Sequence, residues 1–435
     1  MQPTLNAGDT AWLLVSTAMV LLMTPGLALF YGGLVRTKNV LSTFMHSFFA
    51  MGLVTVQWVL FGYSLAFGQD HGGLIGGFDL ALLRGVGMEP QQGQTVPHLL
   101  FMAYQMMFAI ITPALISGAF AERVKFSAFA LFTLLWSTFI YDPLAHWVWG
   151  SGGWLLKYGA LDFAGGTVVH ISSGVSALVF ALVVGRRRGY PREKHVPHNM
   201  TMTLLGAGLL WFGWFGFNAG SALGANGLAA LALVNSQIAA GVGAVVWIGI
   251  DIWKHGKASA LGFASGILAG LVAITPAAGF VGPLGALTIG FVAAFVCYGG
   301  VLLKGRFGYD DTLDAFGVHG VGGIAGALLT GVFCAKTWNS AGADGVFAGD
   351  PGFIVKQLVA TLASIVYAAV GTFVLLKLVE KTLGLRVSEE EEFDGLDTAV
   401  HGEEGYAFGS FQAHAAVTEE SLVAAPASLK ASATT

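Results

Sequence analysis

The stretch Asp162-Phe-Ala-Gly-Gly-Thr-Val-Val-His170 opens an apolar segment that continues to the basic cluster Arg186-Arg187-Arg188. This segment is long enough to cross a bilayer, yet it holds a histidine about two helical turns from its start. A second stretch, Asp311-Thr-Leu-Asp-Ala-Phe-Gly-Val-His319, also places an aspartate eight residues before a histidine. We therefore predict that the rest of the chain brings His170 and His319 together inside a membrane.

The composition excludes a water-soluble globular protein. The 435 residues are 55% hydrophobic and only 11% charged, whereas soluble proteins average roughly 25% charged residues. The 62 glycines suit helices that pack closely in lipid. The two cysteines, Cys297 and Cys334, stand in apolar segments, so we predict free thiols without a disulfide or metal framework.

We predict an all-α polytopic membrane protein with eleven spanning helices, each near the ~20 residues that a bilayer requires. The expected spans are 10–32, 43–67, 97–119, 127–147, 165–185, 199–219, 229–251, 258–275, 281–303, 316–335 and 353–379. Residues 1–383 would form the transmembrane domain, with a loop between Phe67 and Pro97, and no cleaved signal peptide is expected. Residues 384–435 would form a cytoplasmic tail, disordered after about residue 408.

The distribution of basic residues predicts the orientation. Of the 21 Lys and Arg, only Arg84, Lys157, Lys336 and Lys356 fall in one set of loops, and all others lie in the opposite set or in the tail. The positive-inside rule then places the N-terminus outside and the C-terminus in the cytoplasm. Asp162 would lie at an outer mouth and Asp311 at an inner mouth, so the two segments would run in opposite directions. This is typical of inverted repeats, here spans 1–5 and 6–10, with the working site near the midplane.

The two histidines have a functional and a structural interpretation. An ionisable group in hydrocarbon normally faces a bundle interior or a cavity, and a neutral histidine pair can bond to itself and still serve a small polar solute. The alternative is two histidines that hydrogen-bond between helices for packing only. A metal site is a third alternative, but no further ligand stands at a suitable spacing.

The aspartates and nearby aromatic residues also allow two interpretations. Asp162 and Asp311 suit helix caps that accept bonds from free backbone N–H groups, and Asp162 would also favour a cation at the outer mouth. Tyr104 and Phe108 share a helix face, and aromatic faces can hold a cation that has lost water. The alternative for all such aromatics, including those at positions 149, 214 and 217, is an interfacial belt.

Four motifs resemble those of the ammonium transporter (Amt/MEP/Rh) family. They are Asp162-Phe-Ala-Gly-Gly-Thr-Val-Val-His170, Gly213-Trp-Phe-Gly-Phe-Asn-Ala-Gly-Ser221, Phe316-Gly-Val-His-Gly320 and Gly118-Ala-Phe-Ala-Glu-Arg123. The likeness covers about residues 8–406. Trp149 and Ser221 together resemble the Amt branch, of bacterial type, more than the Rhesus branch. Tyr104 stands where many bacterial relatives have phenylalanine, and its hydroxyl would change the polarity of the outer vestibule.

The resemblance implies a role for each candidate site residue. The outer ammonium recruitment site would contain Phe108, Trp149 and Ser221, supported by Asp162. Phe108 and Phe217 would form a stacked phenyl gate, with Trp214 beside it, and His170 and His319 would line the pore. The family also implies a homotrimer with one pore per subunit. By analogy, its tail docks a trimeric PII signalling protein; no enzyme activity, cofactor or nucleic-acid partner is implied.

The predicted function is ammonium transport across the cytoplasmic membrane. Ammonium would lose its proton at the mouth, because desolvating the full charge costs far more than a few contacts return. Neutral ammonia would then pass the gate and the histidines. Three alternatives remain open: a Rhesus-like gas channel, an ammonium sensor acting through a partner protein, and a membrane metalloenzyme.

Overall fold

The computed structural model describes residues 4–193 and 195–406, and within them helices dominate. The first part of the chain contains α1 (Ala7–Leu34), α2 (Val40–Gln57), α3 (Tyr63–Phe67), α4 (His98–Ile116), α5 (Phe126–Trp136), α6 (Asp142–Trp149), α7 (Trp154–Tyr158) and α8 (Ser172–Val184). The second part contains α9 (Met200–Gly220), α10 (Gly227–His255), α11 (Ala260–Ile274), α12 (Pro283–Phe307), α13 (Val321–Phe333), α14 (Phe353–Leu383) and α15 (Glu389–Asp394). The π-helical segments η2 (Trp58–Gly62), η5 (Ser137–Tyr141), η6 (Gly166–Ile171), η7 (Phe316–Gly320) and η9 (Asp397–His401) continue or join these helices.

Ten helical segments of the described chain are long and apolar enough to span a bilayer, and α11 is an apolar helix of 15 residues. They overlap all eleven predicted spans. Helix α11 differs from the predicted span 258–275 by only one or two residues at each end, whereas the helical segment Phe126–Tyr158 continues well beyond the predicted end at residue 147. At 1.5 Å per residue α11 measures about 22 Å, less than the ~30 Å hydrocarbon core. The helix stops before Pro276, whose ring contacts the segment that carries His170.

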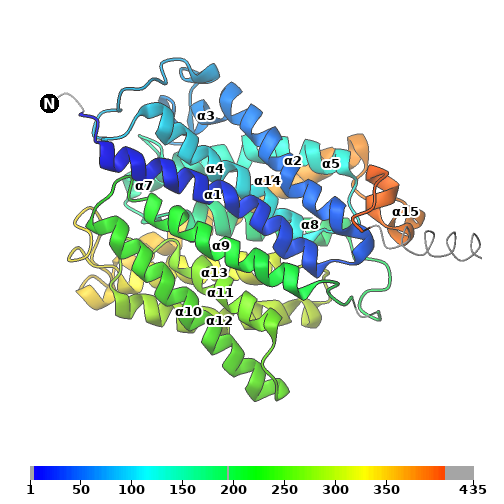
Figure 1. Ribbon diagram of the computed structural model, residues 1–435. Helices are drawn as coiled ribbons and strands as arrows, with labels where there is room; N and C mark the ends of the chain where they lie inside the picture. The colour runs from blue at the N-terminus through cyan, green and yellow to red at the C-terminus, as the bar shows by residue number, and fades with distance from the viewer. Residues whose placement is uncertain (1–3, 194, 407–435) are drawn as a thin grey trace, which may run out of the picture.

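Helix α1 lies alongside α9, so the start of the first half of the chain packs on the start of the second (Figure 1). Glycines allow this close approach. A Cβ added at Gly206 would lie only 2.3 Å from the backbone nitrogen of Phe30, so any larger residue would push the two helices apart.

The segment between α3 and α4 is more ordered than the predicted loop. It contains a short antiparallel hairpin of β1 (Asp70–His71) and β2 (Ile75–Gly76) and a 3-10 turn at Ala81–Leu83. Asp70 anchors the hairpin, because its carboxylate contacts His146 Nε2 on α6 at 3.0 Å.

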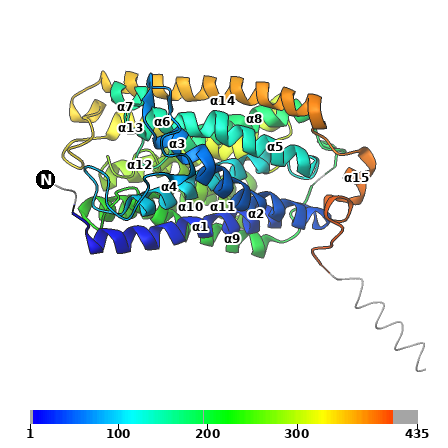
Figure 2. The ribbon, with the colours of Figure 1, turned by 90° about the horizontal axis from the view of Figure 1, so that it is seen from above.

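The described part of the tail folds against the ends of the helices. The carboxylate of Asp397 accepts hydrogen bonds from the backbone N–H groups of Leu41 and Ser42 and thereby caps α2. The start of α1 and helix α15 lie at opposite ends of the bundle (Figure 2). The predicted disorder after residue 408 concerns residues outside the described part of the chain.

Candidate functional site

Asp162 organises the segment that carries His170. Its carboxylate accepts hydrogen bonds from the backbone N–H groups of Gly165, Gly166 and Thr167 at 2.6–2.7 Å. Gly165 has a φ of +114°, a conformation that suits glycine. The chain therefore turns sharply and enters η6 with its free N–H groups satisfied, as the capping interpretation predicts.

Asp311 performs the same task before His319. Its carboxylate accepts from the backbone nitrogens of Ala315 at 3.1 Å and Phe316 at 2.8 Å, at the start of η7. Both histidines therefore stand in π-helical turns, which occur rarely and often at functional sites.

The two histidines meet inside the bundle. His170 Nδ1 lies 3.3 Å from His319 Nδ1, the rings are 5.3 Å apart and nearly parallel, and both side chains are buried. One ring must donate and the other accept, so a neutral pair with opposite tautomers satisfies this contact. His170 Nε2 has no hydrogen-bond partner among the described residues, which leaves it available to a solute.

Trp214 is fixed beside the histidine pair. Its indole ring stacks on His170 with centroids 5.4 Å apart, and its Nε1–H donates to Thr275 Oγ1 at 2.9 Å. The predicted position of Trp214 beside the gate agrees with this geometry, because its ring also lies 5.6 Å from that of Phe217.

Phe108 from α4 and Phe217 from α9 form a stacked pair, with centroids 4.2 Å apart and an interplanar angle of 30°. Beside this pair lies a cavity of about 350 Å³, lined among others by Phe108, Trp149, Asp162 and Ser221, which we call the outer vestibule after the predicted orientation. The indole of Trp149 lies 6.0 Å from Phe108 and donates to the backbone oxygen of Asp162 at 3.0 Å. The structure thus gathers all four predicted recruitment residues around one vestibule.

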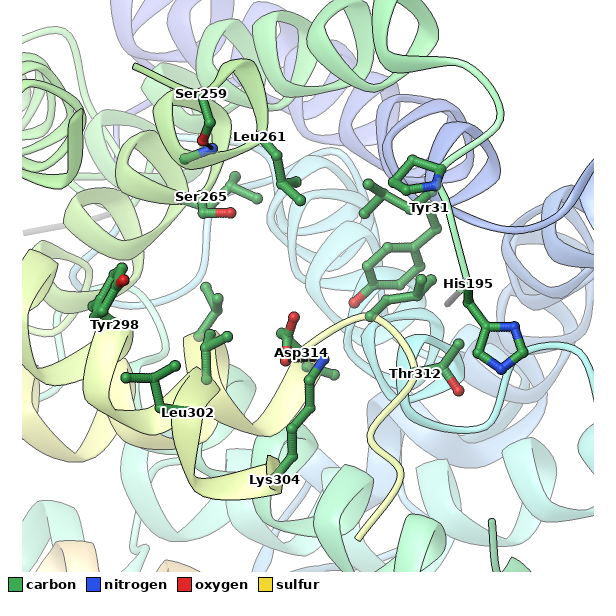
Figure 3. Close-up of a pocket in the computed structure, with 18 of the residues that line it drawn as sticks. Tyr31, His195, Ser259, Leu261, Ser265, Tyr298, Leu302, Lys304, Thr312 and Asp314 are labelled. Carbon is green, nitrogen blue, oxygen red and sulfur yellow. Dashed lines mark hydrogen bonds and ion pairs between the residues drawn. The ribbon is translucent and has the colours of Figure 1, made fainter. Parts of the chain in front are cut away.

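A second, very small cavity of about 10 Å³ lies on the other side of the phenyl pair. It is lined by Phe217, Trp214, both histidines and aliphatic side chains such as Leu268. This volume is close to the minimum that holds one water-sized molecule. A third cavity, of about 580 Å³, is shown in Figure 3. His319 lines both this cavity and the small one, so the two are neighbours.

Charged side chains line the third cavity, which we call the inner vestibule after the same predicted orientation. Lys304 Nζ pairs with Asp314 at 2.6 Å, and both side chains project into the vestibule (Figure 3). Beside it, Arg187 bridges Asp310 and Glu122. Burial opposes ionisation of Glu122, but the positive charges of Arg187 and Arg36 outweigh this effect and lower the pKa of its carboxyl.

Sequence reasoning did not find every residue that shapes the site. Thr275, Lys304 and Asp314 were not assigned roles, because a single threonine or an ion pair gives no distinctive local pattern. For metal binding, no group of three His, Cys, Asp or Glu side chains gathers within residues 4–193 and 195–406. The two cysteines in this range are buried free thiols, as predicted.

Comparison with known proteins identifies the family. Residues 11–406 match the family model described as Ammonium Transporter Family. An ammonium transporter of Bacillus subtilis is 53% identical over 92% of this chain and 99% of its own length, and one of Aquifex aeolicus is 51% identical over 92% and 94%.

Solved structures agree with this match. The crystal structure of Saccharomyces cerevisiae Mep2 covers 89% of each chain, with a TM-score of 0.84 and 37% identity. A structure titled Sensor Amt Protein covers 90% of this chain and 98% of its own, with a TM-score of 0.83 and 29% identity. The motifs around both histidines, the fold and these relatives together show that the chain, a multi-pass membrane protein, belongs to the ammonium transporter family.

Proposed function

We propose that the chain recruits ammonium in the outer vestibule, removes its proton there and conducts ammonia to the inner vestibule. The observation that carries this proposal is the order of the site. The stacked Phe108 and Phe217 rings separate the outer vestibule from the small cavity that holds His170 and His319.

The outer vestibule suits a cation. Aromatic faces of Trp149 and Phe108 border it, and a cation against such rings gains about 2 kcal/mol or more when water is excluded. Ser221 adds a hydroxyl that can accept a hydrogen bond from ammonium. Asp162 supports the site through its backbone oxygen, which holds the Trp149 indole.

The cavity beyond the gate suits a neutral molecule. A full charge placed there would lose its water in a space of about 10 Å³ lined mainly by apolar groups, at a cost of several kcal/mol or more. Ammonia can instead exchange hydrogen bonds with His170 and His319. Potassium carries no proton to release, so the same path excludes it.

The working arrangement is that of an inner-membrane homotrimer, with the N-terminus outside, the tail in the cytoplasm and five-helix repeats of opposite direction. The start of α1 and helix α15 lie at opposite ends of the bundle, which supports their placement on opposite sides of the membrane, and the pairing of α1 with α9 supports the repeats. Exposed apolar side chains on α12 and α14, such as Leu284 and Val366, suit contact with lipid or with neighbouring subunits. Docking of a PII-type protein on the tail rests on family analogy.

The test is the current evoked by an ammonium pulse on protein reconstituted in supported proteoliposomes, beside an equal potassium pulse. We expect a response to ammonium and none to potassium. Current indicates that charge crosses too, whereas internal alkalinisation without current indicates net ammonia passage.

Replacing both histidines by leucine should remove selective conduction while the protein stays folded. Unchanged ammonium flux and selectivity in this double variant would contradict the proposed pore. If wild-type protein binds ammonium but gives neither signal, the sensor function becomes the better conclusion.

A further inference from the structure

We propose that Tyr104 is a positioning residue, which holds the Ser221 hydroxyl as a hydrogen-bond acceptor for ammonium in the outer vestibule. The inference rests on the proposed function, since it requires ammonium to pause beside Ser221. It assigns a role to a side chain that does not itself border the vestibule.

The hydroxyl of Tyr104 reaches the end of α9 behind Ser221. Its oxygen lies 2.9 Å from the backbone oxygens of both Gly216 and Phe217, and 3.2 Å from Ser221 Oγ. Tyr104 is completely buried, whereas Ser221 borders the outer vestibule. Gly220 makes room for this contact, because a Cβ there would lie 2.7 Å from the tyrosine oxygen.

The hydroxyl protons of this cluster limit which hydrogen bonds Ser221 can make. The two hydroxyls carry one proton each, and the two backbone oxygens can only accept. If Tyr104 donates to a backbone oxygen, Ser221 can donate to Phe217 O at 2.9 Å or to the tyrosine oxygen. If Tyr104 donates to Ser221 instead, Phe217 O still takes the serine proton. In each of these arrangements the serine proton points into the protein and a serine lone pair remains free.

A free lone pair at Ser221 distinguishes ammonium from water. Ammonium only donates hydrogen bonds, so a serine proton directed into the vestibule would repel it, whereas water tolerates either orientation. Without the Tyr104 hydroxyl, Ser221 loses one of its two inward acceptors and rotates more freely. The Tyr104 ring also packs against the Phe108 ring, with centroids 5.0 Å apart. Removal of the hydroxyl alone leaves this contact in place.

The experiment compares ammonium-evoked currents of wild type, Y104F, S221A and the Y104F/S221A double variant in proteoliposomes. We expect the KM for ammonium to rise about threefold to tenfold in Y104F, the range for one hydrogen bond between uncharged groups. The maximal current should change little, because the gate and the histidines are untouched. In the double variant, KM should equal that of S221A.

A matched control removes a hydroxyl from another buried tyrosine. Tyr63 is also fully buried, and its hydroxyl contacts His98 Nε2 at 2.7 Å, so Y63F should leave KM unchanged. Melting temperature and elution volume check that each variant is folded.

The outcomes separate this inference from the proposed function. If S221A leaves KM unchanged, Ser221 does not recruit ammonium, and both the recruitment step and the role of Tyr104 are wrong. If S221A raises KM and Y104F does not, only the role of Tyr104 is wrong. If the two effects multiply in the double variant, Tyr104 holds α4 to α9 independently of Ser221, which also overturns the inference.

Discussion

The segments Asp162–His170 and Asp311–His319 share one local design and differ in what surrounds it. In both, a carboxylate caps a π-helical turn and the histidine follows eight residues after the aspartate. Both oxygens of Asp162 are satisfied by nearby N–H and O–H groups of its own segment. Asp311 accepts only two backbone bonds and lies beside Asp314 and Lys304.

This difference follows the surface that each segment faces. The outer segment borders an aromatic vestibule, where its backbone holds Trp149. The inner segment borders a charged vestibule that contains the Lys304–Asp314 ion pair. The Asp-to-His turn is therefore the same in both segments, while one segment borders an aromatic vestibule and the other a charged one.

The largest contrast is expected from removing one charge in each segment. In Asp162→Asn an amide NH₂ replaces an oxygen that accepts backbone N–H groups at 2.6–2.7 Å, and each lost charge-assisted bond is worth about 1.5–3 kcal/mol. We expect the ammonium flux to fall by about a hundredfold or more. In Asp311→Asn the ammonium flux should fall by about tenfold or less, since fewer hydrogen bonds depend on that carboxylate.

Initial flux and melting temperature of the purified variants measure this contrast. Equal losses in Asp162→Asn and Asp311→Asn would show that the two caps are equivalent, and the proposed asymmetry would then be wrong.

A smaller contrast is expected from the glycines four residues after each histidine. A Cβ at Gly174 would lie 2.1 Å from the backbone nitrogen of Gly320, whereas a Cβ at Gly323 would meet Gly166 O and His170 Cβ at 3.0 Å. Gly174→Ala should therefore lower stability by about 1–3 kcal/mol and flux by about tenfold. The ammonium flux of Gly323→Ala should stay within about threefold of wild type, because small shifts of the neighbouring atoms relieve a 3.0 Å contact.

Thermal unfolding and ammonium flux are measured for both glycine variants. The reverse order, with Gly323→Ala more damaging than Gly174→Ala, would mean that the two segments do not pack as described.

The smallest effect concerns pH at the inner segment. Burial, together with the nearby charge of Asp314, raises the pKa of Asp311 to about 7, while Lys304 opposes the shift. The folded protein therefore holds this proton over a range in which the unfolded chain, with a pKa near 3.9, releases it. The contribution of Asp311 to stability is greatest at low pH and decreases as pH rises from about 4 to 7.

The difference in melting temperature between wild type and Asp311→Asn tests this sign. Between about pH 5 and pH 8, the melting temperature of wild type should fall by a few degrees relative to that of Asp311→Asn. A pH-independent difference would indicate that Asp311 is already ionised at pH 5.

Much of the fold could be predicted because its cause is local. Apolar length predicted the positions of the spanning helices, α11 included, and the aspartates were foreseen as caps. The extension of the fourth helical segment to Tyr158 was not foreseen, because the run Gly150-Ser-Gly-Gly153 interrupts the apolar pattern. Thr275 was missed because its partner, Trp214, lies far away in the sequence, and Lys304 because a single ion pair gives no distinctive local pattern.

The sequence by itself determined the class of the protein, its apolar helices and the motifs that assign it to the ammonium transporter family. Those features follow from composition, from spacing along a helix and from the identity of short runs of residues. Only the tertiary structure decided that His170 and His319 touch, that Phe108 and Phe217 close one vestibule, and that Tyr104 stands behind Ser221. These contacts join residues more than a hundred positions apart, and close packing of distant helices is what brings such side chains within hydrogen-bonding or stacking distance.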